Sequence, residues 1–186
     1  MKIMKFLIEY LKSPRTVGAV APSSERLAER MVRGIDFKNA EFIVEYGPGT
    51  GVFTDKLVKE KNKDTILILL ECNKEFCTQL KERYNGFDNI ILINDSAENI
   101  DKYLKQYNIN KVDYVVSGLP FASLPKDVSN KILRQTKNVL NKDGLFITFQ
   151  YTLLKKEFIA GYFEKIHIER VLFNVPPAYV LKCQIF

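Results

Sequence analysis

Residues that could crosslink the chain or bind a metal ion are scarce in this sequence. Its three cysteines, Cys72, Cys77 and Cys183, are odd in number and form no C-x-x-C pair, so the sequence predicts neither a disulfide framework nor a zinc site. The single histidine, His167, lies in a strand-like run with no second type of metal ligand nearby, and we expect no bound metal. This use of cysteine favours the reducing cytosol.

Long apolar runs are also missing. A membrane-spanning helix needs about 18 consecutive apolar residues, and no such run occurs in the chain. The segment Met1–Lys12 is interrupted by Lys2, Lys5, Glu9 and Lys12, so it does not match the apolar region of a signal peptide. We therefore expect neither a membrane span nor a secretion signal.

The charged residues of Met1–Lys12 instead recur at spacings of three and four, which places them on one face of an amphipathic helix that ends at Ser13-Pro14. Two roles fit this pattern, and they are not exclusive. The helix can pack its apolar face on the domain as a lid, or it can lie in a membrane interface with its lysines near anionic head groups.

The chain is basic, with a formal net charge of +6. That excess favours a polyanionic partner, either nucleic acid or the anionic face of a membrane. A lysine-rich solvated surface has the same composition, so charge alone does not choose between these interpretations.

The order of helical and strand-like segments predicts a single α/β domain over residues 1–186, with an N-terminal helical segment (1–34) and an α/β core (35–186). The N-terminal segment includes a helix over about Glu25–Arg33, capped by Ser23 or Ser24. Because strands that alternate with helices form right-handed crossovers, we expect a mostly parallel sheet covered on both faces. The predicted strands are Glu41–Tyr46, Thr65–Glu71, Asn89–Ile93, Val112–Ser117 and Leu145–Tyr151, and the helices between them are Phe53–Lys61, Lys74–Tyr84, Ile100–Tyr107 and Lys126–Leu140.

The C-terminal part departs from this alternation. The turn-type sequence of residues 141–144, N-K-D-G, predicts the end of the last of these helices before the strand at Leu145. Phe163–Phe173 and Tyr179–Phe186 are strand-like and have no helix between them. We expect them to pair as an antiparallel hairpin at one edge of the sheet.

A glycine-rich turn follows the first strand. Gly47, Gly49 and Gly51 let the backbone turn tightly and approach a ligand, at the carboxyl end of a strand where doubly wound sheets bind their ligands. The spacing G-x-G-x-G differs from the G-x-G-x-x-G of NAD-binding proteins, and no Lys-Ser/Thr pair follows as in a P-loop.

Three acidic residues accompany this turn. Glu45, two residues before Gly47, would repel a pyrophosphate but suits a ligand that carries a cation. Glu71 ends the second strand, where an acid accepts hydrogen bonds from ribose hydroxyls. Asp95 ends the third strand and can accept from the exocyclic amine of adenine or cap the next helix. Together they indicate S-adenosylmethionine rather than NAD or a nucleoside triphosphate.

These segments resemble motifs of class I, Rossmann-like methyltransferases of the rRNA adenine dimethylase-like superfamily: V-E-Y-G-P-G-T-G at 44–51, L-L-E at 69–71 and N-D-S-A at 94–97. The resemblance implies a seven-stranded sheet with an antiparallel last hairpin and S-adenosylmethionine as methyl donor. The cofactor-binding residues that it implies are Glu45, Tyr46, Gly47, Gly49, Thr50, Gly51, Glu71, Cys72, Asp95, Ser96, Ala97 and Ser117.

The fourth strand ends in S-G-L-P-F, at residues 117–121. Adenine methyltransferases acting on rRNA and DNA carry (N/D)-x-P-(Y/F) there, with the first residue holding the target amine and the aromatic ring stacked on the flipped base. Gly118 stands where those enzymes have Asn or Asp. The 186 residues also contain no counterpart of the small helical C-terminal domain of rRNA dimethylases. Adenine N6-methylation therefore stays an alternative function.

A second resemblance extends over nearly the whole chain. K-S-P-R-T-V-G-A-V-A-P-S-S at 12–24, S-G-L-P at 117–120 and N-V-P-P-A-Y-V at 174–180 resemble the bacterial phospholipid N-methyltransferases. This resemblance implies stepwise methylation of the phosphatidylethanolamine amine and of its mono- and dimethyl forms. We expect a cytoplasmic monomer that associates peripherally with the inner face of the membrane. A soluble small-molecule amine is a third possible acceptor.

Methyl transfer from a sulfonium needs mainly the positioning of a neutral amine in line with the methyl carbon. The hydroxyl of Ser117 and the carbonyls of Gly118 and Leu119 can orient the amine. Aromatic ring faces can stabilise the methylated, cationic product. The predicted catalytic residues are Ser117, Gly118, Leu119 and Tyr151, and the predicted substrate-binding residues are Tyr10, Arg15, which can meet a lipid phosphate, Pro120, Phe121 and Tyr151.

Overall fold

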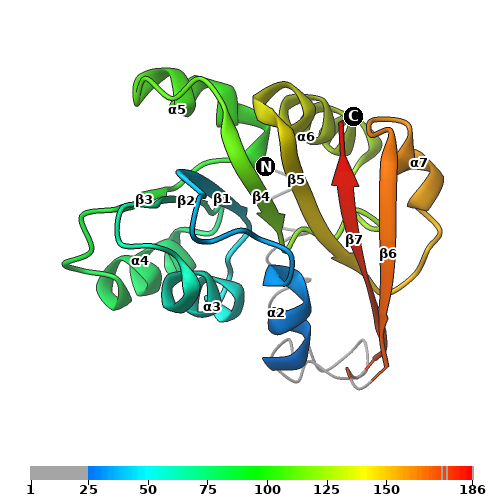
Figure 1. Cartoon of the computed structure of the whole chain (residues 1–186), viewed down its shortest axis with the longest axis horizontal. Coiled ribbons are helices and arrows are strands. Elements are labelled where there is room, and N and C mark those ends of the chain that lie inside the picture. The colour runs from blue at the N-terminus through cyan, green and yellow to red at the C-terminus, as the bar shows by residue number, and fades with distance from the viewer. Residues whose placement is uncertain (1–24, 173, 175, 186) are drawn as a thin grey trace.

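The computed structural model describes residues 25–172, 174 and 176–185. It contains a seven-stranded sheet in the order β3-β2-β1-β4-β5-β7-β6 (Figure 1). Strands β1 to β5 are parallel to one another, and β7 is antiparallel to both β5 and β6. The strands are β1 (Phe42–Tyr46), β2 (Ile66–Leu70), β3 (Ile90–Ile93), β4 (Val112–Ser117), β5 (Leu140–Gln150), β6 (Lys165–Val171) and β7 (Ala178–Gln184).

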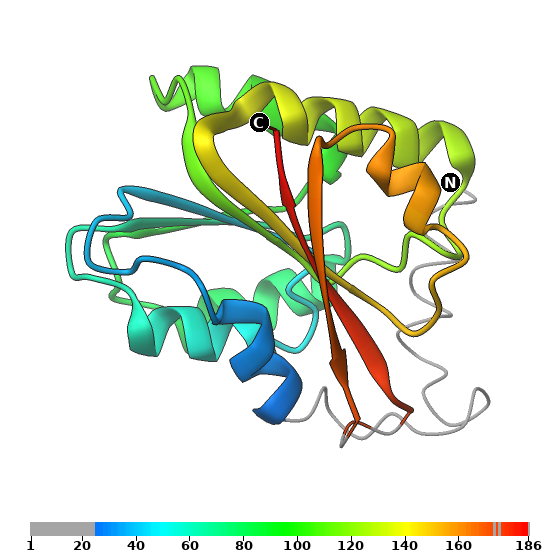
Figure 2. The ribbon, with the colours of Figure 1, turned by 45° about the vertical axis from the view of Figure 1, so that its right-hand side comes forward.

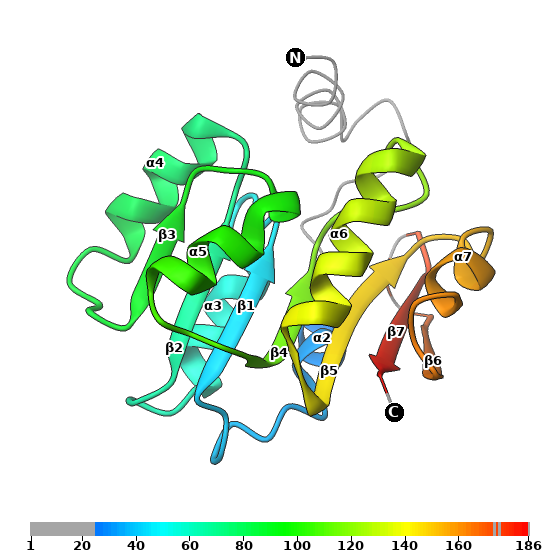
Figure 3. The same ribbon diagram turned by 90° about the horizontal axis from the view of Figure 1, so that it is seen from above.

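The predicted parallel sheet with an antiparallel C-terminal hairpin at one edge is thus confirmed. Helices cover both of its faces (Figure 3). On one face lie α2 (Glu25–Val32), α3 (Val52–Glu60) and α4 (Lys74–Arg83); on the other lie η1 (Ala97–Asn99), α5 (Ile100–Gln106), α6 (Lys126–Val139) and α7 (Lys156–Ala160).

Strand β2 is apolar throughout because both faces of the sheet are covered. In β2, Ile68 and Leu70 pack into the core on the α6 side, whereas Leu67 and Leu69 pack into the core on the α3 side. All four are almost completely buried. Alternate side chains of one strand therefore build two separate cores.

The prediction for residues 141–144 was wrong in one respect. These residues are not a loop before the strand, because β5 begins at Leu140, directly after α6. Leu140 pairs with Val112 and Leu145 pairs with Tyr114, so the intervening residues of β5 form an irregularity in the ladder. The Asn141 amide donates to the Asp113 carboxylate at 2.5 Å, which ties the irregular segment to β4.

Helix α7 was not predicted. It is only five residues long, too short for the helical periodicity of its sequence to be recognised. The helix predicted over Met1–Lys12 lies outside the described residues. In the described ranges no helix is long and apolar enough to cross a membrane.

Candidate active site

The glycine turn connects β1 to α3 and has a left-handed backbone at Gly47, Gly49 and Gly51, with φ of 63°, 57° and 88°. A Cβ on Gly47 would lie 2.7 Å from a methyl carbon of Leu119, so a side chain here would displace Leu119 and strain a left-handed backbone. The Gly47 amide donates to the Leu70 carbonyl at 2.9 Å. The turn is thus held against the carboxyl end of β2 and faces the residues that follow β4.

The Glu71 carboxylate also holds the glycine turn in place. One carboxylate oxygen accepts from the Gly49 amide at 2.9 Å, and the other accepts from the Asn73 amide at 2.8 Å. The side chain is buried, and burial raises its pKa although these backbone hydrogen bonds oppose the shift. Each carboxylate oxygen retains a second acceptor site, so Glu71 can hold the turn and still accept from a ribose hydroxyl.

Glu45 is completely buried on the α3 side of the sheet. One carboxylate oxygen accepts from the Thr54 hydroxyl at 2.8 Å, while the other has no hydrogen-bond partner. Its neighbours in register, Leu69 and Val116, are apolar. Desolvation raises the pKa of Glu45 to about 8, and the Glu71 carboxylate adds to the shift. An unpartnered buried carboxyl oxygen beside the glycine turn fits a ligand that brings a hydrogen-bond donor with positive charge.

Asp95 lies at the end of β3 and is held by its own loop. Its carboxylate accepts from the Ser96 amide at 2.7 Å, from the Asn99 amide group at 3.1 and 3.2 Å, and from the Tyr103 hydroxyl at 2.7 Å. Desolvation is outweighed by these hydrogen bonds, so the pKa of Asp95 is lowered. The N-cap of η1 is Ser96, and Asp95 instead stabilises the loop before it.

The segment after β4 packs directly on the glycine turn. The Gly118 amide donates to the Tyr46 carbonyl at 2.9 Å. A Cβ on Gly118 would lie 2.8 Å from the Gly47 carbonyl oxygen, closer than real Cβ atoms approach such atoms. Ser117 is completely buried, and its hydroxyl oxygen accepts from the Leu119 amide at 3.2 Å. The two backbones therefore touch, with no side chain between them.

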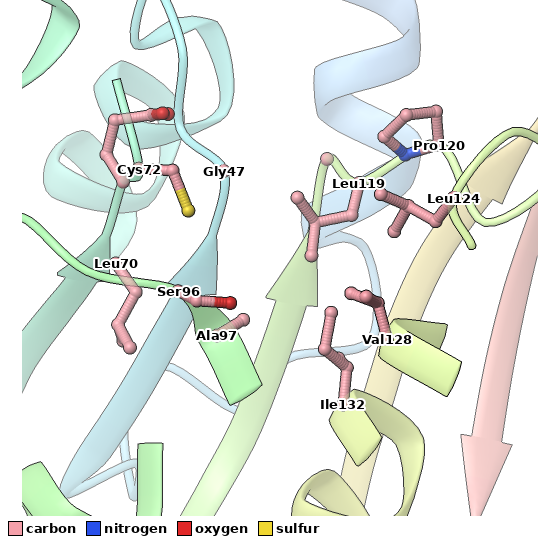
Figure 4. Close-up of a pocket in the computed structure, with 12 residues that line it drawn as sticks. Gly47, Leu70, Cys72, Ser96, Ala97, Leu119, Pro120, Leu124, Val128 and Ile132 are labelled. Carbon is pink, nitrogen blue, oxygen red and sulfur yellow. The ribbon is translucent and has the colours of Figure 1, made fainter. Parts of the chain in front are cut away.

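A pocket opens between these segments. Figure 4 shows its two walls, one formed by the ends of β2 and β3 and the other by the segment after β4 together with α6. The sequence-predicted residues that line it are Gly47, Glu71, Cys72, Ser96, Ala97, Gly118, Leu119 and Pro120, and the lining residues that were not predicted are Leu70, Leu124, Val128 and Ile132.

The sequence did contain a signal for part of the missed wall. Val128 and Ile132 are four residues apart on the apolar face of α6, a spacing that places both on one side of a helix. That face was interpreted only as a cover for the sheet. The carboxylate partners Thr54 and Asn73 were also missed, because their roles depend on contacts with β1 and β2.

Several predicted site residues do not line the pocket. The Tyr46 ring is buried, and its hydroxyl accepts from Thr136 at 3.4 Å. Phe121 is buried and packs edge-to-face on Phe146, with ring centroids 6.0 Å apart. Tyr151 is half-buried and packs in the same manner on Phe149 at 5.4 Å. The other predicted residues away from the lining are Glu45, Gly49, Thr50, Gly51, Asp95 and Ser117, while Tyr10 and Arg15 lie outside the described residues.

In the part of the chain that the structure describes, no group of three or more His, Cys, Asp and Glu side chains is placed to hold a metal ion. The site instead offers carboxylates, backbone groups and apolar walls. Those groups suit a ligand that combines an ammonium group, a ribose and a flat base.

A comparison with solved structures shows the same fold in a methyltransferase. The structure superposes on a Burkholderia thailandensis 1,6-didemethyltoxoflavin N1-methyltransferase that contains S-adenosylhomocysteine, with a TM-score of 0.69 over 97% of this chain and 85% of that one, at 10% identity. The architecture and the glycine-turn site together define a class I methyltransferase, and the methyl donor is S-adenosylmethionine.

Within that class, the chain belongs to the ribosomal RNA adenine dimethylase family, whose profile matches residues 23–165. An ornithine lipid N-methyltransferase from Singulisphaera acidiphila is 32% identical over 96% of this chain and 94% of its own length. The ribosomal RNA small subunit methyltransferase A of Borreliella afzelii is 32% identical over 59% of this chain. The matched part of the chain spans only 36% of that relative's length.

Proposed function

We propose that this methyltransferase transfers methyl groups to the primary amine of a membrane lipid. The observation that carries the proposal is the contact between Gly118 and the Gly47 carbonyl, which leaves no space for a side chain at position 118. Enzymes that methylate adenine hold the target amine with an Asn or Asp side chain at this point. An acceptor whose amine is on a flexible chain can instead be held by the backbone.

The choice of lipid head group has two candidates. The second resemblance in the sequence favours phosphatidylethanolamine. The similarity to an ornithine lipid N-methyltransferase, which covers nearly all of both chains, favours an ornithine head group. Both head groups carry a primary amine, and both lipids have acyl chains. The apolar residues Leu119, Leu124 and Val128 in the pocket wall are compatible with either lipid.

The proposed reaction uses backbone groups after β4. The neutral amine nitrogen forms a bond to the donor methyl carbon while the carbon–sulfur bond breaks and its electron pair goes to sulfur; the amine then loses a proton to solvent. The Leu119 carbonyl already accepts from the Phe121 amide at 3.0 Å and has one acceptor site left, so we assign the orientation of the amine first to the Gly118 carbonyl. The Ser117 hydroxyl positions this segment through its bond to the Leu119 amide.

The test supplies labelled donor with three acceptors: phosphatidylethanolamine vesicles, ornithine lipid vesicles and ribosomal RNA. We expect label in the lipid fraction, and the lipid that is labelled identifies the head group. Glu71→Ala is the control, because it removes the support of the glycine turn and should abolish donor binding, measured by calorimetry. Label only in N6-methyladenine, with normal donor binding by the unmodified chain, would overturn the proposal.

A further inference from the structure

Large apolar side chains are exposed at both ends of the strands of the sheet. Among the described residues, Phe87 and Tyr107 are 46% and 41% exposed and precede β3 and β4, at the amino ends of the parallel strands. Leu153, Leu154 and Leu172 are 38%, 87% and 58% exposed and follow β5 and β6. We call these three leucines the leucine rim.

The sheet register places the leucine rim on the side of the active site. Tyr179, at the start of β7, pairs with both Gln150 at the end of β5 and Arg170 near the end of β6. The carboxyl ends of β5 and β6 accordingly lie toward the same lower side of the sheet in Figure 2. The Gln150 amide oxygen also accepts from the Ala122 amide at 3.2 Å, which joins the end of β5 to the segment that lines the pocket.

Basic residues flank the leucine rim. Lys155 lies 5.4 Å from the ring centroid of Phe158, and the Arg170 guanidinium lies 5.8 Å from that of Tyr179. Lys156 pairs with Glu157 at 3.4 Å, and both side chains are well exposed. With three basic residues and one acid, this border attracts an anionic surface.

We propose that the leucine rim inserts into the interface of an anionic lipid bilayer, with Lys155, Lys156 and Arg170 at the level of the head groups. Exposed apolar side chains next to basic side chains bind the interface of a lipid bilayer, because the apolar groups insert and the basic groups contact anionic head groups. The leucines lie on the same side of the sheet as the carboxyl ends of the strands that form the pocket, so insertion would bring the pocket toward the head groups of the bilayer. This inference rests on the proposed function, because a lipid acceptor has to be reached in a bilayer.

The chain contains no tryptophan, so a single introduced tryptophan reports its own surroundings. Leu154→Trp should show a blue-shifted emission when phosphatidylglycerol–phosphatidylethanolamine vesicles are added, and brominated lipid should quench it. Tyr107→Trp, at the amino ends of the parallel strands, is the matched control and should show neither effect. An unshifted Leu154→Trp spectrum, or equal shifts at both positions, would overturn the proposal.

Vesicle sedimentation gives a second measurement. Leu153→Ser combined with Leu154→Ser should weaken partitioning by about tenfold per leucine, whereas Tyr107→Ser should leave it unchanged. Lys156→Ser should weaken it by about fivefold, compared with Lys105→Ser, which breaks a similar exposed ion pair with Asp101. Unchanged partitioning of the double leucine variant contradicts the inference.

Methylation assays separate this inference from the proposed function. The double leucine variant should lose activity on vesicles but retain normal turnover of a short-chain lipid supplied as monomers. Failure of the unmodified chain to methylate either form would overturn the proposed function, while the vesicle measurements would still report on the leucine rim. Equal activity of variant and unmodified chain on vesicles would overturn the inference alone.

Discussion

At the scale of single residues, the site depends on buried groups whose arrangement follows the needs of the pocket. Glu45 is completely buried with one unpartnered carboxyl oxygen, an arrangement that costs stability unless a ligand or a proton compensates it. Gly118 and Gly47 bring two backbone segments into contact where side chains would separate them. Both features shape the pocket, and each leads to a measurable expectation.

The pH dependence of stability should report the proton on Glu45. The folded chain retains this proton up to about pH 8, whereas the unfolded chain loses it near the ordinary value of 4.5. The free energy of unfolding contributed by Glu45 should therefore be fully present below pH 4.5 and fall as pH rises toward 8. Glu45→Gln should remove this slope and, above that range, be more stable by a few kcal/mol, on the order expected for such shifts. Urea unfolding of the ligand-free chain measures both curves; parallel curves would contradict the assignment.

Donor binding should involve the same proton. The ammonium group of S-adenosylmethionine favours ionised Glu45, so binding at pH 7 should release a proton from the unmodified chain and not from Glu45→Gln. Calorimetry in buffers of different ionisation enthalpy measures that release. Equal proton release by the two proteins would mean that Glu45 does not meet the charged end of the donor.

A side chain at position 118 should disrupt the pocket. Gly118→Ala places its Cβ 2.8 Å from the Gly47 carbonyl oxygen, which forces the glycine turn away from β4 and should cost about 1–3 kcal/mol of stability and most of the donor affinity. Gly161→Ala is the matched control, because Gly161 has a right-handed helical backbone and an ordinary 3.5 Å nearest contact. Thermal unfolding and donor titration compare the two; equal effects would argue against a specific contact at Gly118.

At the scale of elements, β1, β4 and β5 are joined at their amino ends, on the side of the sheet opposite the site. The Asp113 carboxylate accepts from the Glu41 and Phe42 amides at 2.8 and 3.0 Å and from the Asn141 amide group. One side chain of β4 thus joins the start of β1 to the irregular start of β5. The sequence showed a turn signal at residues 141–144, but this signal is compatible with a loop and with a bulged strand.

Asp113→Ala should therefore remove hydrogen bonds that join β1, β4 and β5. Losing hydrogen bonds to a charged acceptor should lower stability by about 2–3 kcal/mol. Donor affinity should change little, because the site lies at the other ends of the strands. Asp143→Ala, at an exposed position in the irregular segment of β5, is the control. Chemical denaturation measures the free energy of unfolding of both variants. A decrease below about 0.5 kcal/mol for Asp113→Ala would show that the Asp113 hydrogen bonds contribute little to stability.

At the scale of the whole molecule, the ligand site is made from segments far apart in the chain. The pocket joins the ends of β1, β2, β3 and β4 with one face of α6, so a bound ligand should stabilise the entire sheet against unfolding.

Binding of the product S-adenosylhomocysteine should accordingly raise the melting temperature. At about 100 times the dissociation constant, the stabilisation is about 2.7 kcal/mol, which corresponds to an increase of about 5–10 °C for a chain of this size. Glu71→Ala should not show the increase, since the glycine turn loses its carboxylate support. Scanning calorimetry with and without the ligand measures the effect. Full stabilisation of Glu71→Ala would place the ligand elsewhere.

The sequence by itself determined the order of strands and helices, the antiparallel hairpin, the glycine turn and the series of acids at strand ends. These features are local: periodicity reflects which faces are buried, and strand ends can be recognised from neighbouring residues. The type of cofactor followed from them.

Only the tertiary structure decided which predicted residues meet in the pocket. Phe121 follows β4 within the predicted acceptor motif, but it packs on Phe146 of β5. Val128 and Ile132, in a helix predicted to cover the sheet, also form a wall of the pocket. The Gly118 contact and the leucine rim likewise arise from strand pairing between distant segments. Side-chain direction in such a sheet depends on register with neighbouring strands, and register is set by the packing of the whole molecule.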